Sequence, residues 1–134
     1  MHKRLMMGLA VCLCTLPLPL AAAPFDGSAP MLCAAIDVFE CTAQNACVRS
    51  TAESVNLPTF IRLDVAAKTL GSAGVASRTT PVERVEHLHG RLILQGGENG
   101  RGWSMIVTED TGKFSASVSD DQVGFIVFGA CTLP

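Results

Sequence analysis

From Val82 to the C-terminus, short runs of alternating apolar and polar residues are separated by turn-forming residues. The turns lie about ten residues apart, at His89-Gly90, Asn99-Gly100, Thr111-Gly112 and Asp120-Asp121. Because neighbouring side chains of a strand point to opposite faces, this spacing predicts successive antiparallel strands with one buried face. We therefore expect an all-β fold, an antiparallel meander of about six to eight strands that forms a small barrel or curled sheet, since closure removes exposed edges.

The hairpin at Asn99-Gly100 sets the register of this meander, because a two-residue type I′ turn requires positive φ at both positions. It also places Glu98 opposite Arg101, where we expect a cross-strand ion pair. The same register puts three pairs on one inner face: Leu92 with Val107, Leu94 with Met105, and Gly96 with Trp103, whose indole is expected to cover the glycine.

The neighbouring turns extend the inner face. A turn at His89-Gly90 pairs His87 with Leu92. A four-residue loop over 109–112, with Gly112 left-handed, keeps Phe114, Ala116 and Val118 on the inner face, and a two-residue turn at Asp120-Asp121 adds Val123, Phe125 and Val127. Upstream, residues 60–65 predict a strand, residues 33–39 a strand or a helix, and residues 71–80 a flexible loop.

Residues 1–23 have the organisation of a secretory signal peptide. Lys3 and Arg4 precede an apolar run that ends in Ala21, Ala22 and Ala23. The run contains two prolines and is too short for a comfortable transmembrane helix, so we expect cleavage and a single β domain over 24–134, periplasmic or secreted. The alternative is a lipoprotein, because residues 9–12 roughly resemble a lipobox ending at Cys12.

Removal of this segment leaves four cysteines, which in a small exported domain predict two disulfides. Three pairings are possible. We expect Cys41 to pair with Cys47 in a local loop, and Cys33 to pair with Cys131 and tie the ends of the domain together. The spacings contain no Cys-x-x-Cys and match no standard zinc site.

Three segments carry a resemblance: Arg-Leu-Ile-Leu-Gln-Gly-Gly-Glu-Asn-Gly-Arg-Gly-Trp-Ser over 91–104, Glu-Asp-Thr-Gly over 109–112, and Phe-Gly-Ala-Cys over 128–131. Together they resemble small exported proteobacterial proteins of unknown function. The resemblance implies the compartment and the β fold, and it implies no activity.

The motifs that suggest chemistry have structural explanations. Asp110-Thr111-Gly112 matches the aspartic-protease triplet, but a single copy lies in an expected turn. The glycine-rich segment 96–102 leads into a strand rather than the helix of a phosphate-binding loop. Glu86, His87 and His89 are potential metal ligands that the register places on different faces or in a turn. We therefore expect no catalytic, cofactor-binding or metal-binding residues.

The leading functional hypothesis is a non-enzymatic binding or interaction module of the cell envelope, whose partner is a protein or a small apolar ligand. The register leaves four large apolar residues on the outer face, and exposed apolar patches mark interaction surfaces: Ile93, Ile106, Ile126 and Phe128. We expect these four to form a contiguous strip. The alternative is that residues 42–57 cover them.

A second hypothesis is an inhibitor of an envelope or host hydrolase such as lysozyme, with a rigid loop that blocks the catalytic cleft. The candidate loop consists of Gly97, Glu98, Asn99, Gly100 and Arg101. Nucleic acid is an unsuitable partner for either function. Residues 1–23 hold two of the ten basic and none of the twelve acidic residues, so the remainder carries a formal charge of −4.

We predict that the native protein begins near residues 22–25, because signal peptidase cuts after small residues such as Ala21 and Ala23. Intact-mass analysis of protein purified from its natural host measures this directly. Retention of Met1, or the mass of an acyl chain on Cys12, would contradict the prediction.

Overall fold

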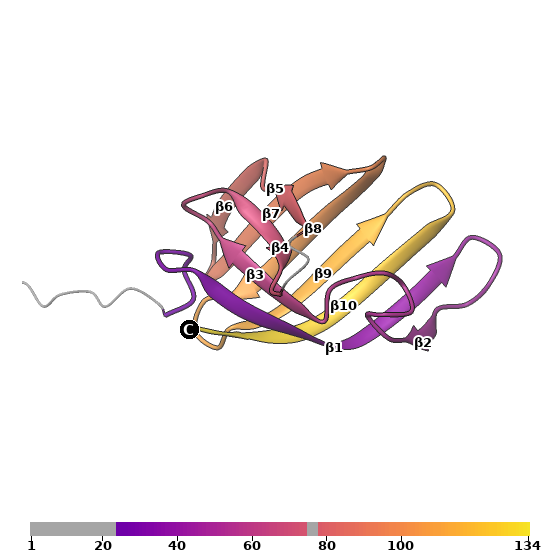
Figure 1. Ribbon diagram of the computed structural model, residues 1–134, viewed down its shortest axis with the longest axis horizontal. Coiled ribbons are helices and arrows are strands. Elements are labelled where there is room, and N and C mark those ends of the chain that lie inside the picture. The colour runs from indigo at the N-terminus through magenta and orange to yellow at the C-terminus, as the bar shows by residue number, and fades with distance from the viewer. Residues whose placement is uncertain (1–23, 75–77) are drawn as a thin grey trace, which may run out of the picture.

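The computed structural model describes residues 24–74 and 78–134, so the signal peptide expected over 1–23 lies outside the described residues. These residues form one antiparallel sheet of ten strands (Figure 1). The strands are β1 (Met31–Thr42), β2 (Val48–Ser50), β3 (Phe60–Asp64), β4 (Thr69–Ser72), β5 (Thr79–Pro81), β6 (Arg84–Leu88), β7 (Arg91–Glu98), β8 (Arg101–Thr108), β9 (Lys113–Ser119) and β10 (Val123–Thr132).

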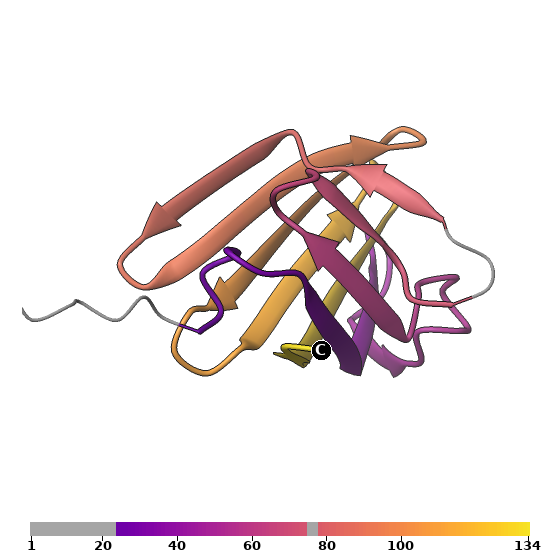
Figure 2. The same cartoon turned by 60° about the vertical axis from the view of Figure 1, so that its left-hand side comes forward.

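The sheet order is β5-β4-β3-β1-β10-β9-β8-β7-β6, with β2 paired to β1 on the side. Figures 1 and 2 show that the sheet curls strongly, so that β3 and β4 face β7 and β8 across the interior. Two consecutive amides link the two edges: Val82 N–H donates to the Lys68 carbonyl at 2.9 Å, and Glu83 N–H donates to the Gln95 carbonyl at 2.9 Å. The all-β curled sheet expected from the sequence is confirmed as a half-barrel.

The concave face carries the hydrophobic core. Alternate residues of the long strands point into it, as the pattern predicts, and the fully buried side chains include Met31, Leu63, Leu92, Leu94, Met105 and Val107. A β-bulge at Ile36 shifts the register of β1 between Ala35 and Asp37. The bulge allows Cys33 and Val38, which an uninterrupted strand would place on opposite faces, both to point inward.

The predicted register of the C-terminal meander is confirmed at three turns. The β6–β7 and β7–β8 turns have positive φ at both central residues, with His89 at 49°, Gly90 at 71°, Asn99 at 52° and Gly100 at 78°. The pairs of β7 with β6 and β8 are those derived above. The β8–β9 loop has four residues, and Gly112 is left-handed with φ of 70°.

The two-residue turn expected at Asp120-Asp121 is wrong. Phe125 lies opposite Val118, and Ser119 pairs with Gly124, so four residues separate the paired positions. The Asp120 carboxylate accepts hydrogen bonds from the amides of Gln122 and Val123, at 2.8 and 2.9 Å, and this side-chain turn holds the longer loop. Because the register shifts by two residues, each side chain keeps its face.

Two further expectations are corrected. The sheet has ten strands instead of six to eight, because the short strands β2, β4 and β5 join it. The flexible loop expected over 71–80 is corrected at both ends: residues 71–72 belong to β4 and residues 79–80 to β5, and the two strands pair with Leu70 opposite Thr80. Residues 75–77 lie outside the described residues. The short strands contain mainly small or polar residues, so the apolar pattern does not reveal them. They form nevertheless, because backbone hydrogen bonds do not require apolar side chains.

Both expected disulfides are present. Cys33 and Cys131 lie directly opposite each other on β1 and β10, 98 residues apart in the sequence, and both are buried. Cys41 and Cys47, six residues apart, close the loop between β1 and β2. The long bridge therefore joins the N-terminal strands to the C-terminal meander.

The N-terminal segment before β1 closes one end of the half-barrel. Phe25 N–H donates to the Glu109 carbonyl at 3.0 Å. The Phe25 ring lies against Gly112, where an added Cβ would come within 2.8 Å of Cε1. Gly27 lies against Val65 and Leu92. This end of the core is thus covered by the chain itself.

We predict that replacing Cys33 and Cys131 by alanine destabilises the protein by about 4–5 kcal/mol, and that replacing Cys41 and Cys47 costs about 2 kcal/mol. The difference follows from the lengths of the closed loops, 98 against six residues. Urea unfolding of both double variants tests this. Equal losses, or a greater loss from the short loop, would contradict the prediction.

Candidate functional site

The concave side of the half-barrel contains a cavity of about 370 Å³, within the size range of small-molecule sites. It lies between the meander and the β3–β4 hairpin, next to the segment 56–58. Apolar side chains from both walls form most of its surface, among them Leu57, Ile61, Leu70, Met105, Val118 and Val127. The arrangement suits an apolar molecule, because each contact removes apolar surface from water.

Two polar side chains of the cavity wall lack a hydrogen-bond partner among the described residues. They are Thr80 on β5 and Trp103 on β8, which are only 8% and 9% exposed. Both Thr80 Oγ1 and Trp103 Nε1 expose less than 1 Å². A buried polar group without a partner costs about 1–3 kcal/mol, so such groups require an explanation.

Gly96 positions the Trp103 indole. The two residues are opposite each other on β7 and β8. A Cβ added to Gly96 would lie 2.6 Å from Cζ2 of the indole and 2.6 Å from the Pro81 carbonyl oxygen. The glycine therefore lets the ring lie flat on β7 beside the chain segment that follows Thr80, as the sequence predicts for an aromatic residue that covers a glycine.

The charged residue that borders the cavity is Arg78. Its guanidinium Nε lies 3.8 Å from Oε1 of Glu98, and half of its side chain is exposed. Arg78 is therefore a residue of the cavity rim, and its charge is offset by an acidic neighbour.

The residues of the predicted partner surface share the outer face. Ile93 lies opposite Ile106, Ser115 lies opposite both Ile106 and Phe128, and Ile126 lies opposite Ser117. Ile106 is 39% and Phe128 45% exposed. The serines of β9 thus divide the expected strip into two apolar pairs, Ile93 with Ile106 and Ile126 with Phe128. The division arises because the longer β9–β10 loop places Ile126 opposite Ser117 instead of Ser115.

Residues 42–57 lie on both sides of the sheet: the guanidinium of Arg49 lies over the Phe39 ring, 5.2 Å from its centre. Ala52 and Val55 belong to the core, and Leu57 packs against the core and borders the cavity. The second apolar pair is instead flanked by β1: Phe39 lies opposite Ile126, and its ring meets that of Phe128 edge-on at 6.3 Å. Ala52, Val55 and Leu57 thus lie on the concave side, and cover of the whole strip by residues 42–57 stays a prediction.

The candidate inhibitory loop, Gly97 to Arg101, is the tip of the β7–β8 hairpin. The expected ion pair between Glu98 and Arg101 is wrong: Glu98 pairs with Arg78, and Arg101 Nε donates to Asp120 at 3.0 Å. The guanidinium of Arg101 also lies over the Phe125 ring, 5.6 Å from its centre. Contacts with neighbouring loops thus outweigh the cross-strand pair, and inhibition of a hydrolase stays a prediction.

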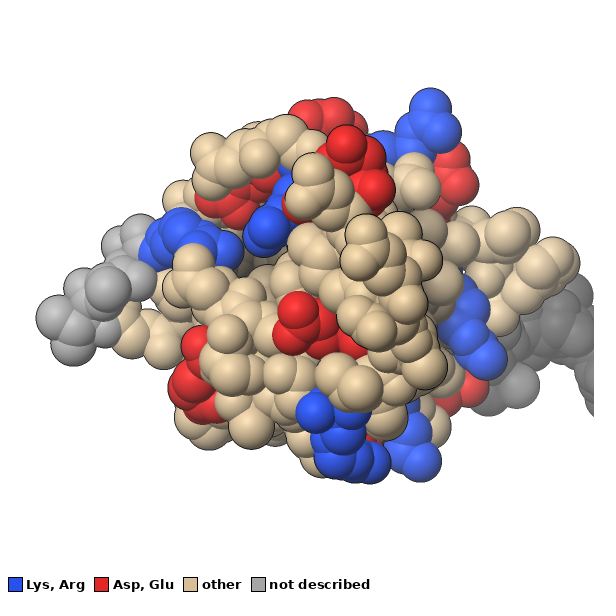
Figure 3. Space-filling model, turned by 90° about the vertical axis from the view of Figure 1, so that its right-hand side faces the viewer, with Lys and Arg blue, Asp and Glu red and all other residues tan. Residues whose placement is uncertain are grey.

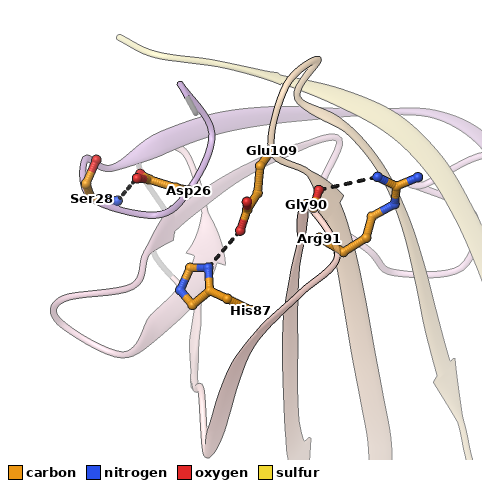
Figure 4. Close-up of polar contacts among 6 residues, drawn as sticks. All are labelled: Asp26, Ser28, His87, Gly90, Arg91 and Glu109. Atoms are coloured by element: carbon orange, nitrogen blue, oxygen red, sulfur yellow. Dashed lines mark hydrogen bonds and ion pairs between the residues drawn. The ribbon is translucent and has the colours of Figure 1, made fainter. Parts of the chain in front are cut away.

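The histidines that suggested metal chemistry are separated. His87 Nδ1 lies 2.7 Å from Oε1 of Glu109, a residue of the β8–β9 loop (Figure 4). His89 occupies the left-handed turn. Within residues 24–74 and 78–134, no group of three or more His, Cys, Asp or Glu side chains could hold a metal ion.

Charged side chains are dispersed over the face that Figure 3 shows. Basic and acidic side chains form separate small groups there among uncharged residues. This face therefore carries no continuous basic stripe of the kind that tracks a phosphate backbone. In the part of the chain that the structure describes, no helix has the length and apolarity needed to cross a membrane.

Comparison with known proteins found no relatives: no family model, no curated protein and no solved structure matches this chain. The function must therefore be inferred from the geometry. The sequence pattern predicts the inner position of Trp103, but no pattern in the sequence indicates the cavity. Thr80 falls in the loop expected over 71–80, and the Thr-Thr-Pro triplet of β5 carries little signal for a strand.

We predict that Asp120 stabilises the β9–β10 loop in a pH-dependent manner. Hydrogen bonds from the Val123 and Gln122 amides and from Arg101 lower the pKa of Asp120 to about 2. Because the folded-state pKa is depressed, the stabilisation is present above the unfolded pKa of about 4 and is lost as the pH falls through about 2. Asp120→Asn should therefore lower the Tm at pH 7, and its difference from wild type should shrink between pH 4 and pH 2 and vanish below about pH 2.

Thermal unfolding followed by circular dichroism between pH 1.5 and 7 measures this. Asp121→Asn is the matched control, because it removes the same charge one residue away, where no hydrogen bond to Gln122 or Val123 is lost. A Tm difference for Asp120→Asn that is the same at pH 2 and pH 7 would refute the prediction.

Proposed function

We propose that this protein is a non-enzymatic binding module that acts outside the cytoplasm and holds a small, mainly apolar molecule inside the half-barrel. The observation that carries the proposal is the cavity of about 370 Å³, lined by apolar side chains from β3, β4, β8, β9 and β10. A ligand there is stabilised by burial of its apolar surface at about 25 cal/mol per Å².

The unpartnered polar groups of Thr80 and Trp103 support the same proposal. The unsatisfied hydroxyl of Thr80 lowers the free energy of unfolding, and an apolar residue at position 80 would avoid this loss of stability. The hydroxyl therefore has an explanation if it contacts a ligand. Small-molecule sites characteristically combine an apolar wall with a few polar groups that orient the ligand.

The apolar residues of the outer face are weaker evidence for a binding site than the cavity is. Ile106 and Phe128 are separated by Ser115, and β1 lies beside the second apolar pair. The predicted export is supported by the two disulfides, since such bonds persist in oxidising compartments.

We predict that the neutral apolar fluorophore N-phenyl-1-naphthylamine binds the protein with one-to-one stoichiometry. The chain has one tryptophan and no tyrosine, so energy transfer from Trp103 reports binding of the fluorophore to the protein. Ala116→Phe should weaken binding about tenfold or more, because Ala116 lines the cavity between Met105 and Val127 and a larger ring there fills the space. A fluorescence titration measures both effects.

Ser119→Phe is the matched control, because Ser119 is an exposed residue of the same strand. It should leave the affinity unchanged, and circular dichroism verifies that both variants fold. Equal binding of the fluorophore to wild type and Ala116→Phe would place it elsewhere, and the proposal would fail.

A further inference from the structure

The polar groups of the cavity wall also indicate the chemistry of the ligand. We infer, on the basis of the proposed function, that the ligand is an uncharged molecule with an acceptor oxygen, such as a ketone, an ester or an ether. Its oxygen accepts hydrogen bonds from the Thr80 hydroxyl and the Trp103 indole N–H.

The hydrogen-bonding capacity of the two groups defines the partner that both can share. An indole N–H only donates, whereas a threonine hydroxyl donates or accepts. The partner that satisfies both is therefore an acceptor. The two side chains come from β5 and β8, and Gly96 lies against both the indole and the carbonyl of Pro81, the residue after Thr80. Both donors thus belong to residues that line the same cavity.

Access to these atoms requires a small movement, because each exposes less than 1 Å². Rotation about the Cα–Cβ bond of Thr80 turns its hydroxyl without moving β5. Most of the remaining lining surface is apolar, with Leu57, Leu70 and Met105 among its residues. A bound molecule therefore presents its oxygen to Thr80 and Trp103 and its hydrocarbon part to these apolar side chains.

The charges of the site favour an uncharged ligand. Arg78 is the charged residue of the lining among those described, and it lies at the rim with its guanidinium near Glu98. A carboxylate bound inside would lose its hydration and gain no full ion pair, because Glu98 offsets the Arg78 charge. An ammonium group would face two hydrogen-bond donors. A neutral carbonyl or ether oxygen avoids both penalties.

The test uses two ligands of the same shape, 2-octanone and 2-methyl-1-octene, which differ in a carbonyl oxygen against a methylene group. Each displaces N-phenyl-1-naphthylamine from wild type, Thr80→Val and Thr80→Ser. Thr80→Val should weaken 2-octanone about five- to tenfold relative to the alkene, because one hydrogen bond is lost. Thr80→Ser, which retains the hydroxyl, should restore the preference. Trp103→Phe, read by direct excitation of the fluorophore, should resemble Thr80→Val.

The outcomes distinguish failure of acceptor recognition from failure of the binding function. If both compounds displace the fluorophore and Thr80→Val affects them equally, acceptor recognition is overturned and the binding function stands. If octanoate displaces it more strongly than 2-octanone, and Arg78→Gln removes that advantage, the ligand is an anion and the inference is wrong. If the fluorophore binds wild type and Ala116→Phe equally, the proposed function itself fails.

Discussion

The antiparallel pairing of β1 with β10 is the constraint on which the rest of the structure depends. It runs from Leu32 opposite Thr132 to Thr42 opposite Val123, and it contains the buried bridge between Cys33 and Cys131. On one side of the pair lies the β6–β10 meander, and on the other lie β3, β4 and β5. Because the cavity has walls from both groups, it exists only while this pair holds them together.

The short β4–β5 hairpin helps to close the half-barrel around the cavity. It completes the cavity wall through Leu70 and Thr80, and the amides of Val82 and Glu83 then connect the two edges of the sheet. This closure brings the Pro81 carbonyl close to Gly96 and confines the Trp103 indole. The position of the polar groups in the site is thus a consequence of how the half-barrel closes.

Different parts of the chain cover the concave side. The N-terminal segment with Phe25 lies at the β8–β9 loop, while Ala52, Val55 and Leu57 pack against the core from the segment after β2. Both are short, irregular segments with few apolar residues, each placed where the sheet leaves a gap. The interior is therefore enclosed by loops as well as strands, although the sheet determines its shape.

The sequence by itself determined the elements whose information is local. Asn99-Gly100 and Gly112 dictate positive φ, and alternation then decides which residues of β7 to β10 point inward. Even the wrong turn at Asp120 preserved these faces, because the register shifted by two residues. Only the tertiary structure decided the pairing of β4 with β5, the partners of Glu98 and Arg101, and the cavity beside Thr80. These features depend on contacts between distant segments, and the space left between two packed walls has no signature in the order of the residues.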